Sequence, residues 1–320
     1  MKTSEAVTPK HPDKICDRIS DKILDECLKQ DENSRVAVEV MGGHGKITVM
    51  GEITTNADIN IIDSINEITD KKYQVEVNVV SQSNEIANGV DSGGAGDQGI
   101  MVGYACMENE AMLPQESYLA KDLCKYIYKK YPVDGKTQIT IDDKNKIVDV
   151  VASFMSVSSK DLTKIVDKWI KKKKKIKEVK KHVNPAGDWS TGGFDADSGL
   201  TGRKIVVDGY GPRVPVGGGA FSGKDATKVD RSGAYMARKK AIQLLRENNA
   251  KKVLVRVAYA IGEKEPVMLM AKIDDQLVDL EDSKEEFTPD KIINDLGLRK
   301  SIFEKTAKWG PFGNGFIWDR

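Results

Sequence analysis

The chain has 320 residues, of which 39% are hydrophobic, enough for two or three units of ordinary size with a sizeable core. Its 50 basic and 49 acidic residues nearly cancel, which argues against a general binder of nucleic acid or acidic membranes. We find no run of roughly 18 apolar residues, no signal peptide and no C-x-x-C pair among the four cysteines, so we expect a soluble, cytoplasmic protein with reduced thiols.

Hydrophobic periodicity predicts helices alternating with hairpins. A helix over 11–30 precedes strands at 35–41 and 46–55 and a helix at 57–72. The same order returns as a helix at 114–131, strands at 136–142 and 146–157, and a helix at 160–172. It returns again as a helix at 228–248, strands at 251–262 and 266–273, and a helix at 288–298. This pattern predicts an α+β fold of three similar helix–hairpin–helix units.

Other segments fall outside the repeat. Strand-like runs at 73–81 and 203–211 could add to a sheet or cross between units. The polar, glycine-rich stretches 82–99 and 184–223 are long enough to suggest functional loops. The lysine-rich run 171–181 is interpreted as a solvated helix end, with a polyanion site as the alternative.

The segment GGGAFSGKD at 217–225 nearly completes a P-loop. Gly218, Gly223 and Lys224 fit G-x-x-x-x-G-K, but Asp225 stands where Ser or Thr would hold magnesium. From these residues alone it is a damaged P-loop, a chance match or a phosphate loop of another kind.

The stretch HPDK opens the first predicted helix. Pro12 suits the first helical position, which puts His11 at the cap and Asp13 in the first turn. Free N–H groups there favour an anion, and a histidine at such an end can donate a hydrogen bond to a leaving oxygen. The alternative is that Asp13 is only a helix-start carboxylate.

Five cations lie near glycine turns, and several carboxylates accompany them. The alternative for Arg203 and Lys204 is a pair of surface charges without a functional role. Taken together, the set suits a polyphosphate and its divalent metal. The cations are Lys136, Arg203, Lys204, Lys224 and Lys228, and the carboxylates are Asp13, Asp97, Asp197 and Asp230.

Five motifs in this order resemble those of S-adenosylmethionine synthetases (methionine adenosyltransferases), from about residue 3 to the C-terminus. They are HPDKI, GEITT, GAGDQG, GLTGRK and GGGAFSGKDxxKVDRS. The segment 217–225 resembles the triphosphate loop of that family and not a P-loop, so Asp225 is not a damaged position of a P-loop.

The resemblance implies an enzyme that joins ATP and methionine. The sulfur attacks C5′, triphosphate leaves, and the enzyme hydrolyses it to pyrophosphate and phosphate. The implied catalytic residues are His11, Lys136, Arg203, Lys204 and Lys224, and the nucleotide contacts also include Trp189, Asp197 and Ala220. The implied methionine contacts are Glu52, Gln82, Asp97, Asp197 and Lys228. The implied ligands of the two magnesium ions are Asp13 and Asp230, and the implied potassium ligand is Glu39.

The resemblance also implies an architecture. Three α+β units would surround a pseudo-threefold axis, formed from 1–9 plus 109–192, 10–84 plus 193–232, and 85–108 plus 233–320. Their flat sheets would meet across a homodimer with two active sites at the interface, and dimers often pair into tetramers. We expect a strand-rich face with apolar positions such as Val36, Val38 and Val40 to need such a partner.

The sequence departs from the family pattern at three places. Lys10 replaces a usual glycine, Asp188 stands where a positive contact is usual, and the segment between Gln82 and Gly96 is short. Two other functions compete: another ATP-dependent phosphotransferase, and an inactive nucleotide-binding subunit. The joint presence of His11, Asp13, Lys224, Lys228 and Asp230 argues against the second.

Overall fold

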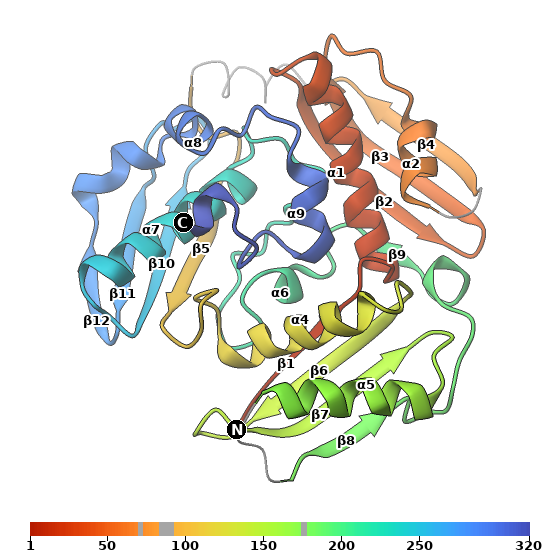
Figure 1. Cartoon of the computed structure of the whole chain (residues 1–320). Coiled ribbons are helices and arrows are strands. Elements are labelled where there is room, and N and C mark those ends of the chain that lie inside the picture. The colour runs from red at the N-terminus through yellow and green to blue at the C-terminus, as the bar shows by residue number, and fades with distance from the viewer. Residues whose placement is uncertain (70–72, 83–92, 174–177) are drawn as a thin grey trace.

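The computed structural model describes residues 1–69, 73–82, 93–173 and 178–320. It is a mixed α+β structure with three four-stranded sheets. Figure 1 shows these sheets and their helices around the short helices α6 (Ile205–Asp208) and α9 (Phe303–Trp309). The α+β class and the three predicted hairpins are confirmed. In the described part of the chain, no helix combines the length and apolarity needed to cross a membrane.

The first sheet carries the long helix α1 (Pro12–Gln30). Its order is β4-β3-β2-β9, and β4 runs parallel to β3 after helix α2 (Ile61–Ile68). Its strands are β2 (Arg35–Gly43), β3 (Lys46–Thr54), β4 (Gln74–Val80) and β9 (Gly199–Leu200). The predicted strand at 73–81 is therefore confirmed.

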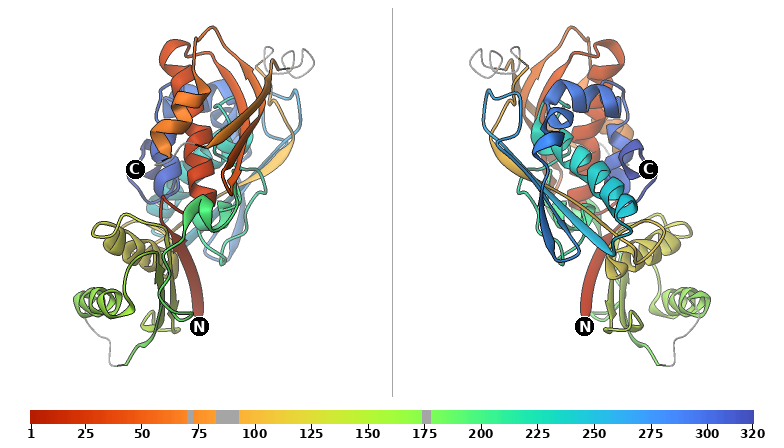
Figure 2. Two further views of the ribbon diagram at one scale, coloured as in Figure 1. Left: turned by 90° about the vertical axis from the view of Figure 1, so that its right-hand side faces the viewer. Right: turned by 90° about the vertical axis from the view of Figure 1, so that its left-hand side faces the viewer.

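The second sheet has the order β1-β6-β7-β8 and carries α4 (Gln115–Tyr128) and α5 (Ser159–Lys172). As in the first sheet, the last strand is parallel to its neighbour and follows a helix. Its strands are β1 (Lys2–Val7), β6 (Gly135–Ile141), β7 (Ile147–Phe154) and β8 (Lys180–Val183). The side views show α1, α4 and α5 to one side of their sheets (Figure 2).

The third sheet, of order β12-β11-β10-β5, departs from the predicted repeat. Its strands are β5 (Gly99–Cys106), β10 (Lys252–Tyr259), β11 (Met268–Ile273) and β12 (Gln276–Asp279), and it carries α7 (Val229–Glu247). Here β12 is antiparallel and directly follows β11, and the 3₁₀ helix η2 (Glu281–Phe287) precedes α8 (Pro289–Leu296). A tight turn replaces the helical crossover because an antiparallel strand does not need one.

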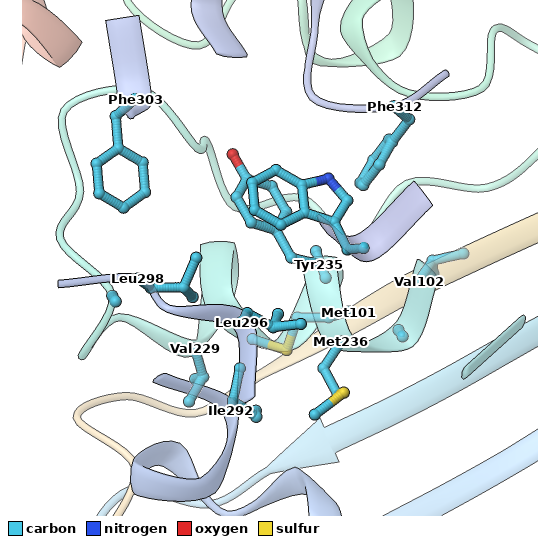
Figure 3. Close-up of a cluster of buried hydrophobic side chains, with 14 of the residues drawn as sticks. Met101, Val102, Val229, Tyr235, Met236, Ile292, Leu296, Leu298, Phe303 and Phe312 are labelled. Atoms are coloured by element: carbon cyan, nitrogen blue, oxygen red, sulfur yellow. The ribbon is translucent and has the colours of Figure 1, made fainter. Parts of the chain in front are cut away.

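A large hydrophobic cluster joins the first and third sheets. Figure 3 shows Tyr235 and Met236 of α7 with Met101 and Val102 of β5. Leu296 at the end of α8 packs into the same cluster. Helix α7 lies so close to β5 that a Cβ on Gly103 would be 2.0 Å from the carbonyl carbon of Ala237. Glycine is therefore needed at that contact.

The expectation that Val36, Val38 and Val40 face a partner chain is wrong. These side chains are at most 1% exposed and belong to the cluster that α1 completes. Alternation along β2 places Ala37, Glu39 and Met41 on the outer face instead. The apolar side of this strand is thus covered within one chain.

The prediction of strand structure at 203–211 is also wrong. Residues 205–208 form the helical turn α6, which ends at Gly209. The β-branched run favours a strand, but tertiary contacts prevail. The turn places the Asp208 carboxylate on buried Lys14, while Lys121 donates to the carbonyls of Asp208 and Gly209.

Four aspartates of α1 bind backbone N–H groups from the second half of the chain. They recur every fourth residue, so they lie on one face of the helix. Asp13 accepts from Leu200, Asp17 from Gly202, Asp21 from Gly223, and Asp25 from Phe303 and Glu304. This aspartate row joins α1 to the turn after β9, to the loop 217–225 and to the start of α9.

We predict that Asp21→Ala lowers the free energy of unfolding by about 3–5 kcal/mol, because it leaves a buried guanidinium unpaired. Arg231 is 1% exposed, and both its terminal nitrogens donate to Asp21 at 2.7 Å. Denaturant unfolding measures the loss. The matched control is Asp167→Ala, which breaks the exposed pair with Lys181 and should change stability by less than about 1 kcal/mol. Equal losses in the two variants would contradict this prediction.

Candidate active site

His11 caps the N-terminus of α1, as predicted. Its Nδ1 accepts a hydrogen bond from the Asp13 N–H at 3.2 Å, and Pro12 is in the first turn. Because Nδ1 is the acceptor, the proton of the neutral ring lies on Nε2. Burial lowers the pKa of His11 to about 3, and the charges of Lys204 and Lys136 act in the same direction. His11 is thus a neutral hydrogen-bond donor at ordinary pH.

Asp13 forms ion pairs with two of the predicted cations, Arg203 and Lys204. Its carboxylate is fully buried, with Arg203 Nε at 2.8 Å and Lys204 Nζ at 2.7 Å. Burial acts to raise its pKa, but Lys204 and the Leu200 amide outweigh burial and hold the pKa below its ordinary value. The close approach of β9 to the start of α1 requires Gly199, since a Cβ there would lie 2.3 Å from the Pro12 carbonyl carbon. Asp13 is therefore ionised and oriented by several donors.

Arg203 and Lys204 do not enter a strand, contrary to the prediction. They lie in the turn between β9 and α6. Lys136 reaches the same region from β6, where it pairs with Val7. Its charge acts on His11, so His11, Asp13, Lys136, Arg203 and Lys204 form one group, which we call the His11 group.

Trp189 and Asp197 lie on the segment that borders the His11 group. Asp197 accepts from the Ser198 N–H, and its charge acts on Asp134. Trp189 is half-buried and lies close to Gly192. Asp134 was not predicted, although it directly precedes Gly135 and Lys136; its carboxylate accepts from the Gly193 N–H at 2.8 Å. Burial raises the pKa of Asp134.

The loop 217–225 attaches to the edge of β2. Val38 donates to the Gly223 carbonyl at 3.1 Å, and Asp225 donates to the Val36 carbonyl at 2.9 Å. The buried Asp225 carboxylate accepts from the Val36 N–H at 2.7 Å and from Lys228 Nζ at 2.6 Å. Asp225 therefore anchors the loop, where a P-loop would have its magnesium-binding hydroxyl.

A second set of predicted residues surrounds this loop; we call it the Lys224 group. It contains Glu39, Glu52, Lys224, Lys228 and Asp230. Lys224 pairs with Asp230, and an isolated bridge joins it to Ala37 of β2. Partial desolvation raises the pKa of Glu39, Lys224 lowers it, and Glu52 on the adjacent strand raises it. The Glu39 and Glu52 carboxylates thus lie within electrostatic range of each other.

The remaining predicted residues lie at the edges of the two groups. Ala220 packs against Gly202, next to Arg203. Asp97 accepts from the Gln98 N–H, and Gln82 donates its backbone N–H to Thr54 at the end of β3. Residues 83–92 of the short segment after Gln82 lie outside the described residues.

Buried Lys14 was not predicted, because the apolar periodicity of the helix does not show which of its charged residues are buried. It donates to Asp17 and Asp208 and is 1% exposed. The four-residue spacing of the aspartates was a readable signal for this network. A cavity of about 300 Å³ lies beside the His11 group, lined partly by Lys10, Ile15, Tyr73 and Asp134.

Comparison with known proteins decides the family. The N-terminal, central and C-terminal domain models of S-adenosylmethionine synthetase match residues 1–92, 92–189 and 191–320. The chain belongs to the S-adenosylmethionine synthetase family.

Relatives of this family align along nearly the whole chain. The S-adenosylmethionine synthase of Brachyspira hyodysenteriae is 40% identical, over 99% of this chain and 95% of the relative. That of Clostridium botulinum is 37% identical, over 99% and 96%. The structure of an unusual S-adenosylmethionine synthetase from Campylobacter jejuni superposes with a TM-score of 0.87 at 32% identity, covering 100% of this chain and 96% of that one.

We predict that His11 stays neutral, with its proton on Nε2, between pH 5 and 8. Its folded-state pKa of about 3 lies below the ordinary 6.5, so only the unfolded chain gains a proton as pH falls through 6.5. Nitrogen-resolved NMR of the histidine rings, with His11→Gln for assignment, measures this. In urea the same ring should titrate near 6.5. A folded-state midpoint near 6.5 would contradict the burial of His11.

Proposed function

We propose that this chain makes S-adenosylmethionine from ATP and methionine. The observation that carries the proposal is the His11 group: a neutral, buried Nε2–H donor beside Lys136, Arg203 and Lys204, in a chain that matches the family along its length. Three cations at a helix N-terminus suit the phosphates of ATP.

The reaction places its demand on the leaving group. The neutral methionine sulfur attacks C5′, the C5′–O bond breaks, and triphosphate leaves with the electron pair while sulfur becomes a sulfonium. No general base is needed. His11 donates from Nε2 to the departing oxygen, and Lys136, Arg203, Lys204 and Lys224 stabilise its charge. Water then cleaves the triphosphate to pyrophosphate and phosphate.

We assign the substrates to the two groups by charge and shape. The Trp189 face stacks on adenine, with Asp197 and Ala220 at the nucleotide and Asp197 also touching methionine. The carboxylates of Glu52 and Asp97 suit the methionine ammonium, and Lys228 suits its carboxylate. Gln82 completes this site.

The donor set also fits the ions that the family implies. Within the described residues, no cluster of three or more His, Cys, Asp or Glu is placed to hold a metal. Magnesium is often held by one or two carboxylates plus substrate phosphates, so the separate Asp13 and Asp230 suit two ions. The ions would neutralise phosphate charge. The Glu39 carboxyl, near Glu52 and exposed on the sheet, suits potassium.

The assembly we propose is a homodimer with two composite sites. Each sheet contains a central hairpin plus a strand from elsewhere in the chain: β9, β1 or β5. This supports three units around a pseudo-threefold axis, divided as 1–9 plus 109–192, 10–84 plus 193–232, and 85–108 plus 233–320. Met41 and Met50 on the outer face of the first sheet are 56% and 51% exposed. Such a face suits a partner, in which the Lys224 group of one chain would meet the His11 group of the other.

We place the enzyme in the cytoplasm. The four cysteines Cys16, Cys27, Cys106 and Cys124 are buried and unpaired. Free thiols of this kind are typical of a reducing compartment.

In an assay with ATP and methionine we expect S-adenosylmethionine, pyrophosphate and phosphate. His11→Ala and Lys224→Ala should each lower kcat by about 10²–10³, with little effect on ATP binding, because each removes stabilisation of the leaving oxygen. Chromatography of products with steady-state kinetics measures both. Release of ADP would instead favour the phosphotransferase, and an unchanged kcat would exclude the substituted residue from the mechanism.

Dimers mixed from His11→Ala and Lys224→Ala chains should recover activity. Random pairing gives about half mixed dimers, each with one intact site, so about a quarter of wild-type activity should return. The chains are refolded together or co-expressed, and differently tagged chains verify the mixing. Each variant refolded alone is the control. No recovery in proven mixed dimers would mean that each site lies within one chain.

A further inference from the structure

Asp188 binds the start of helix α5. Its Oδ1 accepts from the Ser159 N–H at 2.9 Å and from the Ser159 hydroxyl, and the Asn184 side-chain amide donates to it at 3.2 Å. Ser159 is the first residue of α5, where free N–H groups favour a negative charge. These donors hold the pKa of Asp188 below its ordinary value. The carboxylate is therefore satisfied by α5.

The same segment is fastened on its other sides. The Ser156 N–H donates to the Trp189 carbonyl at 2.7 Å, so the residue after Asp188 is held directly. The Asn184 side chain accepts from the Phe154 N–H and donates to the Val157 carbonyl. Residues 184–189 are thus bound to the connection between β7 and α5, and they line a cavity of about 320 Å³ together with Ser153.

We infer that Asp188 is a positioning residue, which holds the Trp189 segment against α5 so that the indole is presented to the nucleotide. The inference rests on the proposed role of Trp189 at adenine. It also accounts for an acidic residue where the family has a positive one: its charge is engaged by the N-terminus of α5. Asp188 acts through the backbone of its neighbour and does not bind the nucleotide itself.

The test compares Asp188→Ala with Asp161→Ala. Asp161 also lies in the first turn of α5, where it pairs with Lys164 and Ser158. Titration with ATP and Mg²⁺ should show about fivefold to twentyfold weaker binding for Asp188→Ala, because stacking on adenine stabilises the bound ground state and the transition state alike. Its kcat at saturating ATP should stay within about twofold. Asp161→Ala should bind ATP like wild type, and Asp188→Asn, which keeps an acceptor for Ser159, should restore most of the affinity.

The variant Trp189→Ala and a fluorescence-quenching experiment distinguish failure of the inference on Asp188 from failure of the adenine role of Trp189. Acrylamide should quench Trp189 more strongly in Asp188→Ala than in Asp161→Ala, with Trp189→Phe giving the contribution of the other tryptophans. Weak ATP binding by Trp189→Ala but not by Asp188→Ala overturns the inference and leaves the proposed function intact. Normal binding by both overturns the inference and the adenine role of Trp189. S-adenosylmethionine formation by wild type, measured on the same preparation, shows whether the enzyme assignment itself holds.

Discussion

The row of aspartates on α1 is the interaction on which the placement of the site depends. Each carboxylate lies one turn from the next and takes N–H groups from the second half of the chain, from Leu200 to Glu304. Burial raises the pKa of Asp17, and it raises that of Asp25 to about 6, so these groups are ionised at an energetic cost. Backbone N–H groups offset that cost at both residues, helped by Lys14 beside Asp17 and by the charge of Arg231 near Asp25. Strand β9, the turn after it, the loop 217–225 and the start of α9, all distant in sequence, are thereby fixed to one helix.

The electrostatics of the His11 group follow from this arrangement. Asp13 fixes Arg203 and Lys204 at the start of α1, and burial together with the charges of Lys204 and Lys136 keeps His11 neutral. A neutral donor with a set tautomer needs no rearrangement when charge develops on a nearby oxygen. The groups of the site are therefore oriented by bonds that belong to the fold itself.

The sequence predicted most of the helices and strands, but it predicted fewer of the tertiary contacts between them. Apolar periodicity located the leading helices and the three hairpins, because one covered face determines these patterns. It failed at 203–211, where a helical turn brings the Asp208 carboxylate into contact with the buried Lys14 ammonium. It also misjudged Val36, Val38 and Val40, because alternation shows that one face is buried without showing what buries it. The roles of the site residues came from motifs, and single-chain geometry leaves the two groups as separate clusters.

The loop 217–225 shows why a motif needs its structural context. In a P-loop the lysine opens a helix, and the next hydroxyl faces the metal. Here Gly223 adopts φ +82°, Asp225 turns back to β2, and α7 begins only at Val229. The glycines and Lys224 still suit an anion, since close backbone approach and a mobile ammonium need no particular helix. In this loop the edge of a sheet takes the place of the P-loop helix as the support, and Asp225 is the residue that makes the difference.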